Sequence, residues 1–316
     1  MNYYIKKNKF NIDKYFSNTI TLPPSFKNEK FVSRNYIKKK NDKFESGGLR
    51  LKNIFKSNYQ DYPLISVIVP NLNGEKLKET LDSILFQKYP NIEIILIDGG
   101  SDNKTLDLIK SVYDDQLDYW ISKKDNGIYD AWNKGIQLSR GNYIGIINSN
   151  DIYYPKAFEY LIKYIKNFSK YDFILGAVEK KKVHAGFRPN EIDLRFNIYP
   201  STVIGFFIKL ESQKKLGLYN LKYRCSSDYD MFYRIIKIYK MKGIPTKADE
   251  VFGKFELGGF SSTLSFFDHL KEELHIRYDN GQNFLILIYI AFGRCLKKTI
   301  LKLKTIFFSS LQWNYK

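Results

Sequence analysis

The pattern of hydrophobic and polar positions changes near Leu64. Before it, residues 1 to about 60 are basic, are interrupted by Pro23, Pro24 and the Gly47–Gly48 pair, and keep no helical or strand period. This predicts an N-terminal extension that either drapes over the main domain or stays mobile. After it, short β-rich apolar runs alternate with stretches in which apolar residues recur every three or four positions. That alternation predicts strands separated by amphipathic helices.

The predicted elements form a regular series. Strands are expected at residues 65–69, 93–97, 117–121 and 143–147, and helices at about 77–85, 104–113 and 129–138, with a further helix opened by Pro155. Strands that alternate with helices at this pitch predict βαβ units with right-handed connections. The fold class is therefore α/β, with a mainly parallel, Rossmann-like sheet and helices on both faces.

Polar clusters follow three of these strands directly. They are Pro70-Asn-Leu-Asn73, Asp98-Gly-Gly-Ser101 and Asn148-Ser-Asn-Asp151. One such cluster is readily explained as a helix cap. Three in succession converge on the carboxyl edge of one sheet, where ligands bind in this fold class, so we interpret them as a binding site.

The ligand chemistry is narrowed by what the first strand lacks. VPNLNGEKLKE contains one glycine and matches neither a G-x-G-x-x-G dinucleotide loop nor a P-loop. The edge offers the carboxylates of Asp98 and Asp151 instead, and Mg²⁺ favours one or two carboxylates together with substrate phosphates. This pattern suggests a metal-bound nucleotide diphosphate.

Net charge and cysteine content bear on the partners and the cellular compartment of the protein. The 316 residues carry a formal net charge of +18, which indicates an anionic partner or a surface of solvated lysines. Lysine and arginine are scattered and no nucleic-acid-binding module is recognisable, so we expect no nucleic acid partner. Two isolated cysteines and three histidines without metal-site spacing argue against a structural zinc and fit a reducing cytoplasm. MNYYIKKNKF lacks the apolar core of a signal peptide.

Four ordered motifs resemble those of the family 2 glycosyltransferases with the GT-A fold, in the subgroup that builds bacterial cell-surface polysaccharide and lipopolysaccharide. They are PLISVIVPNLNG, ILIDGGSDNKT, DNGIYDAWNKGI and GNYIGIINSND, and the resemblance covers roughly residues 46 to 265. It implies a basic extension (1–61), a GT-A domain (62–265) and a C-terminal helical tail (266–316). It also implies an inverting transfer of sugar from a nucleotide diphosphate sugar, with a UDP-sugar as the expected donor, to a saccharide or lipid-linked acceptor.

The resemblance assigns residues to the nucleotide and to a divalent metal, Mg²⁺ or Mn²⁺. Asp98 would contact uracil, and Asp151 would touch the metal as the last residue of an acidic pair. Three departures are present: Asn150 replaces the usual Asp of that pair, Asn126 stands where Lys is common, and Val203 stands where many relatives carry His. The complete nucleotide-binding set implied is Pro70, Asn71, Asn73, Asp98, Gly100, Ser101, Asp125, Gly127, Asp130, Asn133, Lys134 and Asn150.

The catalytic base implied by the resemblance is Asp228, in Cys225-Ser-Ser-Asp-Tyr-Asp230. An inverting transfer needs a base that takes the acceptor hydroxyl proton. The alternative is that Asp228 only caps a helix or stabilises its dipole. His184, in the loop VHAGFRP, is either an acceptor contact or an ordinary surface histidine.

Alternatives of other classes stay open at this point. A nucleotidyltransferase would share the sheet and the metal, but PNLNG lacks the glycine-rich basic loop that holds a triphosphate. Asn150 leaves room for a non-catalytic paralogue. The tail NFLILIYIAFGRCLKKTILKLKTIFF is too short and too charged to span a membrane. It suits either a helix at an anionic membrane surface or one packed on the domain, so we expect a cytoplasmic protein with or without peripheral attachment to the inner face of the cell membrane.

Overall fold

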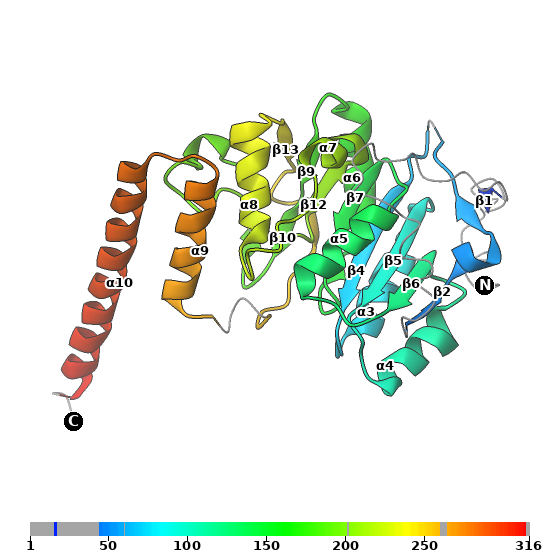
Figure 1. Cartoon of the computed structure of the whole chain (residues 1–316), viewed down its shortest axis with the longest axis horizontal. Helices are drawn as coiled ribbons and strands as arrows, with labels where there is room; N and C mark the ends of the chain where they lie inside the picture. The colour runs from blue at the N-terminus through cyan, green and yellow to red at the C-terminus, as the bar shows by residue number, and fades with distance from the viewer. Residues whose placement is uncertain (1–15, 18–43, 60, 201, 260–263, 314–316) are drawn as a thin grey trace.

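The central element of the protein is an eight-stranded sheet. The computed structural model describes residues 16–17, 44–59, 61–200, 202–259 and 264–313, and Figure 1 shows the arrangement. In spatial order the strands are β13 (Gly243–Pro245), β9 (Phe173–Leu175), β12 (Phe206–Lys209), β7 (Tyr143–Ile146), β4 (Ile65–Asn71), β5 (Ile92–Asp98), β6 (Tyr119–Ser122) and β2 (Glu45–Gly47).

The four predicted strands form the parallel half of this sheet. β7, β4, β5 and β6 pair in parallel, so their carboxyl ends share one edge. β12 pairs antiparallel with both β7 and β9, and β2 pairs antiparallel with β6. The sheet is thus parallel where the sequence predicted it and mixed at the margins. Because β2 lies within residues 1–61, the described part of the predicted extension drapes on the main domain; most of residues 1–43 lie outside the described residues.

Helices cover both faces of the sheet. Alternate residues of β4 point to opposite faces, as in any strand: Ile68 joins a core with α5 (Ile128–Leu138) and α8 (Ser227–Tyr233). Val67 joins a second core with α3 (Leu77–Leu85), the π-helical segment η3 (Ile109–Tyr113) that continues α4 (Asn103–Leu108), and α6 (Ala157–Asn167). Pro155 was predicted to be the first residue of its helix, but α6 begins at Ala157 and Pro155 lies in the turn before it.

Smaller elements complete the described chain. A four-stranded sheet has the order β11 (Val183–His184), β10 (Ala177–Glu179), β14 (Val251–Lys254) and β8 (Ile152–Tyr153), and β1 (Phe16–Ser17) pairs with β3 (Phe55–Lys56). The remaining helices of the domain are η2 (Leu49–Lys52), η4 (Pro189–Glu191), α7 (Leu210–Leu216) and the π-helical segment η5 (Arg234–Ile238).

Two helices form the predicted C-terminal tail. They are α9 (Phe266–Asp279) and α10 (Phe284–Trp313), and α10 lies at the end of the molecule opposite the N-terminal strands (Figure 1). Fully buried Arg277 fixes α9 by pairing with Glu273 at 3.1 Å and donating to the carbonyls of Ile192 and Asp193 at 2.8 Å. Arg294 of α10 pairs with the same Glu273 at 2.9 Å, so this carboxylate links α10 to α9, which Arg277 holds to the domain. Among the described residues no helix is long and apolar enough to cross a bilayer.

Candidate active site

A cavity of about 410 Å³ lies at the carboxyl edge of the parallel strands. Four segments build it: the end of β4, the end of β7, the start of α5, and the loop before α8. The lining residues are Pro70, Asn71, Leu72, Asn148 and Ser149 from the strand ends, Asp125, Asn126, Gly127, Ile128, Tyr129 and Ala131 around the helix start, and Leu221, Tyr223 and Arg224 from the loop. Its position is the one at which ligands bind to open α/β sheets.

The first turn of α5 forms one wall of this cavity. Gly127 is the N-cap and has φ 103°, a left-handed conformation that favours glycine. The backbone N–H groups at a helix N-terminus and the helix dipole favour an anion there. Asp125 precedes this turn, and its carboxylate lies against Gly99, where an added Cβ would come within 2.8 Å of Asp125 Oδ2. Burial raises the pKa of Asp125 above its usual value.

Asp228 lies behind the cavity wall, in the first turn of α8. It is not the N-cap, which is Ser226. The Tyr129 hydroxyl lies 3.3 Å from Asp228 Oδ1 and the Tyr199 hydroxyl lies 3.4 Å from Oδ2, so each donates to a different carboxylate oxygen. Burial raises the pKa of Asp228, and donors including the N–H of Tyr229 oppose that rise. Asp228 is therefore not the N-cap of α8, and its role as the catalytic base stays a prediction.

Asp98 occupies the centre of a buried hydrogen-bond cluster. Its Oδ1 accepts from Asn71 Nδ2 at 2.7 Å and from the Ser101 hydroxyl at 2.5 Å. Its Oδ2 accepts from the N–H groups of Gly100 and Ser101 at 3.2 and 2.9 Å and from the Ser122 hydroxyl at 2.6 Å. The side chain is 1% exposed and is not among the cavity-lining residues. Asp98 therefore holds the ends of β4, β5 and β6 together, and its predicted contact with uracil stays a prediction.

We expect Asp98→Ala to lower the free energy of unfolding by about 3 kcal/mol, because it leaves several buried donors without an acceptor. Chemical denaturation measures this. Asp115→Ala is the matched control: its side chain is 66% exposed and pairs with the solvent-exposed Lys52, so we expect a change under about 0.5 kcal/mol. Wild-type stability combined with weakened UDP binding would instead give Asp98 a direct contact with the base.

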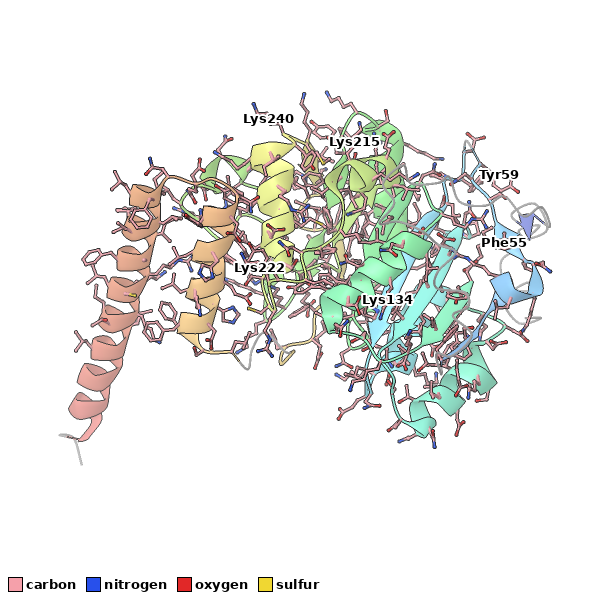
Figure 2. All side chains as sticks on the ribbon, in the orientation of Figure 1. Phe55, Tyr59, Lys134, Lys215, Lys222 and Lys240 are labelled. Atoms are coloured by element: carbon pink, nitrogen blue, oxygen red, sulfur yellow. The ribbon has the colours of Figure 1, made fainter. Side chains whose placement is uncertain are left out.

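Several other predicted contacts bind neighbouring groups of the protein instead of lining the cavity. The Asn133 amide exchanges two hydrogen bonds with the backbone of Tyr219, at 2.9 and 2.8 Å. Lys134, which Figure 2 labels on α5, pairs with Asp130 at 3.0 Å. Asn73 accepts from the N–H of Asp102 at 2.8 Å. These side chains support the cavity walls and are not among its lining residues, and neither are Gly100, Ser101 and Asn150.

Asp151 offers the clearest place for a cation. Its side chain is 2% exposed; Oδ1 accepts from the N–H of Glu256 at 2.9 Å, while Oδ2 has no hydrogen-bond partner among the described residues. The amide oxygen of Asn148 is likewise buried without a partner there. Burial raises the pKa of Asp151 to about 7. Unsatisfied hard oxygens of this kind fit Mg²⁺ or Mn²⁺.

The cation could not rely on protein ligands alone. The described part of the chain contains no group of three or more His, Cys, Asp or Glu side chains placed to hold a metal. Asn150 is exposed at the rim and accepts weakly from the N–H of Lys76 at 3.4 Å. A bound ion would therefore need ligand phosphates to complete its shell, as Mg²⁺ commonly does.

Of the predicted set, the structure brings Pro70, Asn71, Asp125 and Gly127 to the cavity wall. Sequence reasoning missed Tyr129 and Tyr199, whose aromatic side chains carry no sequence signal for contact with Asp228. It also missed the loop before α8, which contributes Arg224 and Tyr223 to the cavity. Val203 is buried in the hydrophobic core, so it does not take the place of a polar acceptor contact.

Comparison with protein families and sequences gives a consistent result. Residues 66–226 match the family described as glycosyl transferase family 2. A glycosyltransferase of Rickettsia typhi is 30% identical over 191 residues, which cover 56% of this chain and 59% of that protein. A PGL/p-HBAD biosynthesis glycosyltransferase of Mycobacterium tuberculosis is 27% identical over 219 residues, covering 66% of this chain and 83% of that protein. The alignment with the rickettsial protein thus spans less than two thirds of that relative.

Solved structures share the fold at low sequence identity. S. aureus TarS 1-349 in complex with UDP-GlcNAc superposes with a TM-score of 0.52 and 15% identity, covering 72% of this chain and 71% of that one. The mannosyltransferase PcManGT from Pyrobaculum calidifontis, in complex with GDP-Man and Mn²⁺, superposes with a TM-score of 0.52 and 16% identity. This match covers 72% of this chain and 68% of that one. The predicted GT-A architecture is confirmed. With the family match extending over half of its residues, the chain belongs to glycosyl transferase family 2.

Proposed function

We propose that this protein is an inverting glycosyltransferase that moves a sugar from a UDP-sugar to a saccharide or lipid-linked acceptor in cell-surface polysaccharide synthesis, with Asp228 as the base. One observation carries the proposal: Tyr129 lines the cavity at the sheet edge and places its hydroxyl 3.3 Å from Asp228. A half-buried carboxylate thus lies one side chain away from a ligand-sized cavity.

The cavity has the features that a nucleotide diphosphate needs. The positive end of α5 supports the diphosphate, and Asp125 is the acidic side chain on the wall that would accept from a base N–H. UDP is the proposed nucleotide because TarS, similar in fold, was solved with UDP-GlcNAc. Because PcManGT, also similar in fold, was solved with GDP-Man, the affinity for GDP should be measured beside the affinity for UDP.

The proposed reaction needs one proton acceptor. The acceptor hydroxyl oxygen attacks the anomeric carbon while its proton passes to a carboxylate oxygen of Asp228. The new carbon–oxygen bond forms as the bond to the diphosphate breaks, and the bonding electron pair leaves with UDP. A base whose pKa is raised takes the proton more readily than an ordinary aspartate.

Asp151, with Asn148 beside it, would hold the divalent cation. A bound ion supplies positive charge to the departing diphosphate. The protein's part is to keep the Asp151 carboxylate oriented through the Glu256 N–H. Because burial raises the Asp151 pKa to about 7, protons compete with the cation for this carboxylate near neutral pH.

The proposal is tested by titrating UDP and GDP into the protein with and without Mn²⁺, and then by measuring hydrolysis and transfer with a panel of nucleotide sugars. Binding of UDP and release of UDP from one donor support it. Absence of binding by either nucleotide, with or without the cation, would overturn it.

A second proposal concerns location: α10 attaches the protein to an anionic bilayer. Leu287 and Ile290 of this helix are buried, whereas Leu285, Ile288 and Phe292 are 74%, 51% and 67% exposed. The exposed apolar residues recur every three or four positions and so lie on one side of the helix. No acidic residue follows Asp279, while six lysines and arginines do, a composition that complements anionic headgroups.

We expect the triple variant Leu285→Ser, Ile288→Ser, Phe292→Ser to lose most co-sedimentation with vesicles of anionic lipid, because it removes the exposed apolar row and leaves the buried face in place. Wild-type binding should weaken as salt is raised. The matched control is Leu51→Ser, Leu194→Ser, Leu257→Ser, which removes three exposed leucines elsewhere. Equal partitioning of both variants and the wild type would favour a packing role for α10.

A further inference from the structure

A second cavity, of about 360 Å³, has a lining residue that contacts Asp228. The hairpin between β10 and β11, the loop that follows it and the segment 197–200 line it. Tyr199 is one of the lining residues, and its hydroxyl lies 3.4 Å from Asp228 Oδ2. Tyr129 of the first cavity approaches Oδ1. Asp228 is therefore reached from two cavities through two different tyrosines.

The chemistry of this second cavity is cationic, and we call it the basic cavity. Its described lining residues include the cations Lys180, Lys182 and Arg188 and no carboxylate; burial and the charges of the two lysines lower the pKa of His184, the remaining titratable group of the lining, and so favour its neutral form. Arg188 is held in place, since it donates to the carbonyl of Asn197 at 2.8 Å and pairs with Glu191 at 3.3 Å. Several cations gathered in one concave site have few uses other than binding an anion.

The surroundings of Lys180 connect the cations to the base. Its ammonium interacts electrostatically with both Asp228 and Asp151, while burial lowers its pKa. The Lys180 side chain also lies over the Phe255 ring, 5.1 Å from its centroid. Lys180 thus belongs both to the lining of the basic cavity and to the charged surroundings of Asp228 and Asp151.

We propose that the basic cavity binds a phosphate group of the acceptor, so that the sugar hydroxyl next to that phosphate is delivered to Asp228. This rests on the proposed function, which it deepens by giving the acceptor a chemical class. The cations hold the anion, Tyr199 lies between anion and base, and the donor occupies the first cavity on the Tyr129 side. A neutral saccharide would leave the cations of the basic cavity unused.

The test measures phosphate binding while UDP and Mn²⁺ fill the first cavity, which is the proposed donor site. Inorganic phosphate, decyl phosphate and neutral decyl glucoside are titrated by calorimetry into protein saturated with UDP and Mn²⁺. We expect both phosphates to bind and the neutral glucoside to bind at least about ten-fold more weakly. Tighter binding of decyl phosphate identifies a lipid-linked source, and equal binding of the two phosphates identifies a soluble sugar phosphate.

The variant Lys182→Gln, Arg188→Gln should lose phosphate affinity at least ten-fold and keep UDP affinity. Lys215→Gln, Lys240→Gln is the matched control: it removes the same charge from positions outside the basic cavity, labelled in Figure 2, and should bind phosphate like the wild type. Because Arg188 also supports the Asn197 carbonyl, Lys182→Glu alone serves as a second variant. It reverses the charge of an exposed side chain and should reproduce the loss.

The outcomes separate this proposal from the proposed function. Normal UDP binding without phosphate binding, or with phosphate binding that both Lys182 variants retain, overturns the basic cavity as a phosphate site and leaves the donor site standing. Failure of UDP to bind counts against the proposed function. In that case phosphate is titrated into the UDP-free protein. Loss of phosphate affinity in the Lys182 variants would still support the basic cavity as a phosphate site, and unchanged affinity would overturn it.

Discussion

Asp228→Asn is expected to lower sugar transfer by about 10²- to 10⁴-fold, the range that general-base catalysis contributes. Asparagine keeps the shape and accepts the tyrosine hydrogen bonds through one oxygen, but it does not take up the acceptor proton. UDP affinity should stay within a few-fold of wild type, because Asp228 lies behind Tyr129 and does not line the donor cavity. Steady-state transfer rates and UDP calorimetry on both proteins measure the two quantities.

Asp230→Asn is the matched control on the same helix. Asp230 is buried, pairs with Arg234 at 2.9 Å and accepts a hydrogen bond from Asn280 at 3.0 Å. Because these contacts are structural, Asp230→Asn should lower the stability of the fold more than the rate of transfer. In the wild type, kcat/KM should fall as pH drops through the Asp228 pKa. Burial raises that pKa, so the fall should come at a higher pH than an exposed aspartate would give. If Asp228→Asn transferred sugar at the wild-type rate, Asp228 would not be the base and its role would be structural.

Asp151→Asn is expected to abolish the dependence of UDP affinity on Mn²⁺. Removing a residue that hydrogen-bonds to a metal ligand typically lowers metal affinity by roughly ten- to hundred-fold. Replacing the ligand itself should lower Mn²⁺-dependent UDP affinity by more than that. In the wild type, protons compete with the cation for a carboxylate whose pKa is about 7, so Mn²⁺-dependent affinity should weaken as pH falls from 8 to 6. Calorimetry with and without Mn²⁺ at pH 6, 7 and 8 measures both effects.

The same variant should be more stable than the wild type without metal at pH 8. The folded-state pKa of Asp151 is raised above its unfolded value, so the folded protein loses stability as pH rises from about 4 to about 7. Asparagine carries no charge to bury, and the advantage should vanish below pH 4. Asn150→Asp, which adds a carboxylate at the exposed rim, should tighten Mn²⁺-dependent binding. Metal-dependent UDP binding that survives in Asp151→Asn would place the cation elsewhere.

The parallel half of the fold could be predicted because its signals are local. Each strand from β4 to β7 is a short β-rich run followed by a polar cluster, and each following helix shows its own period. β12 and β2 escaped prediction because they are short and gain their hydrogen bonds from distant partners: Phe207 pairs with Gly145, and Ser46 pairs with Ile121. Such pairings carry no periodic pattern.

The direction in which polar side chains point was the harder part of the site. Asp98 and Asn133 look like ligand contacts in the sequence, yet both are turned inward to satisfy neighbouring donors and acceptors. Conversely, Tyr129 and Tyr199 reach Asp228 from positions 99 and 29 residues away along the chain. Whether a polar residue faces a cavity or a neighbouring loop depends on tertiary packing, which a strand-end motif does not specify.

The central claim is that Asp228 receives the acceptor proton during a single displacement at the anomeric carbon. It is tested most directly by following the anomeric proton of the product with ¹H NMR during transfer from an α-linked UDP-sugar. The wild type should form a β-linked product with one release of UDP per transfer, and Asp228→Asn should form almost none. An α-linked product would contradict single displacement, and a β-linked product formed at the wild-type rate by Asp228→Asn would contradict the role of Asp228.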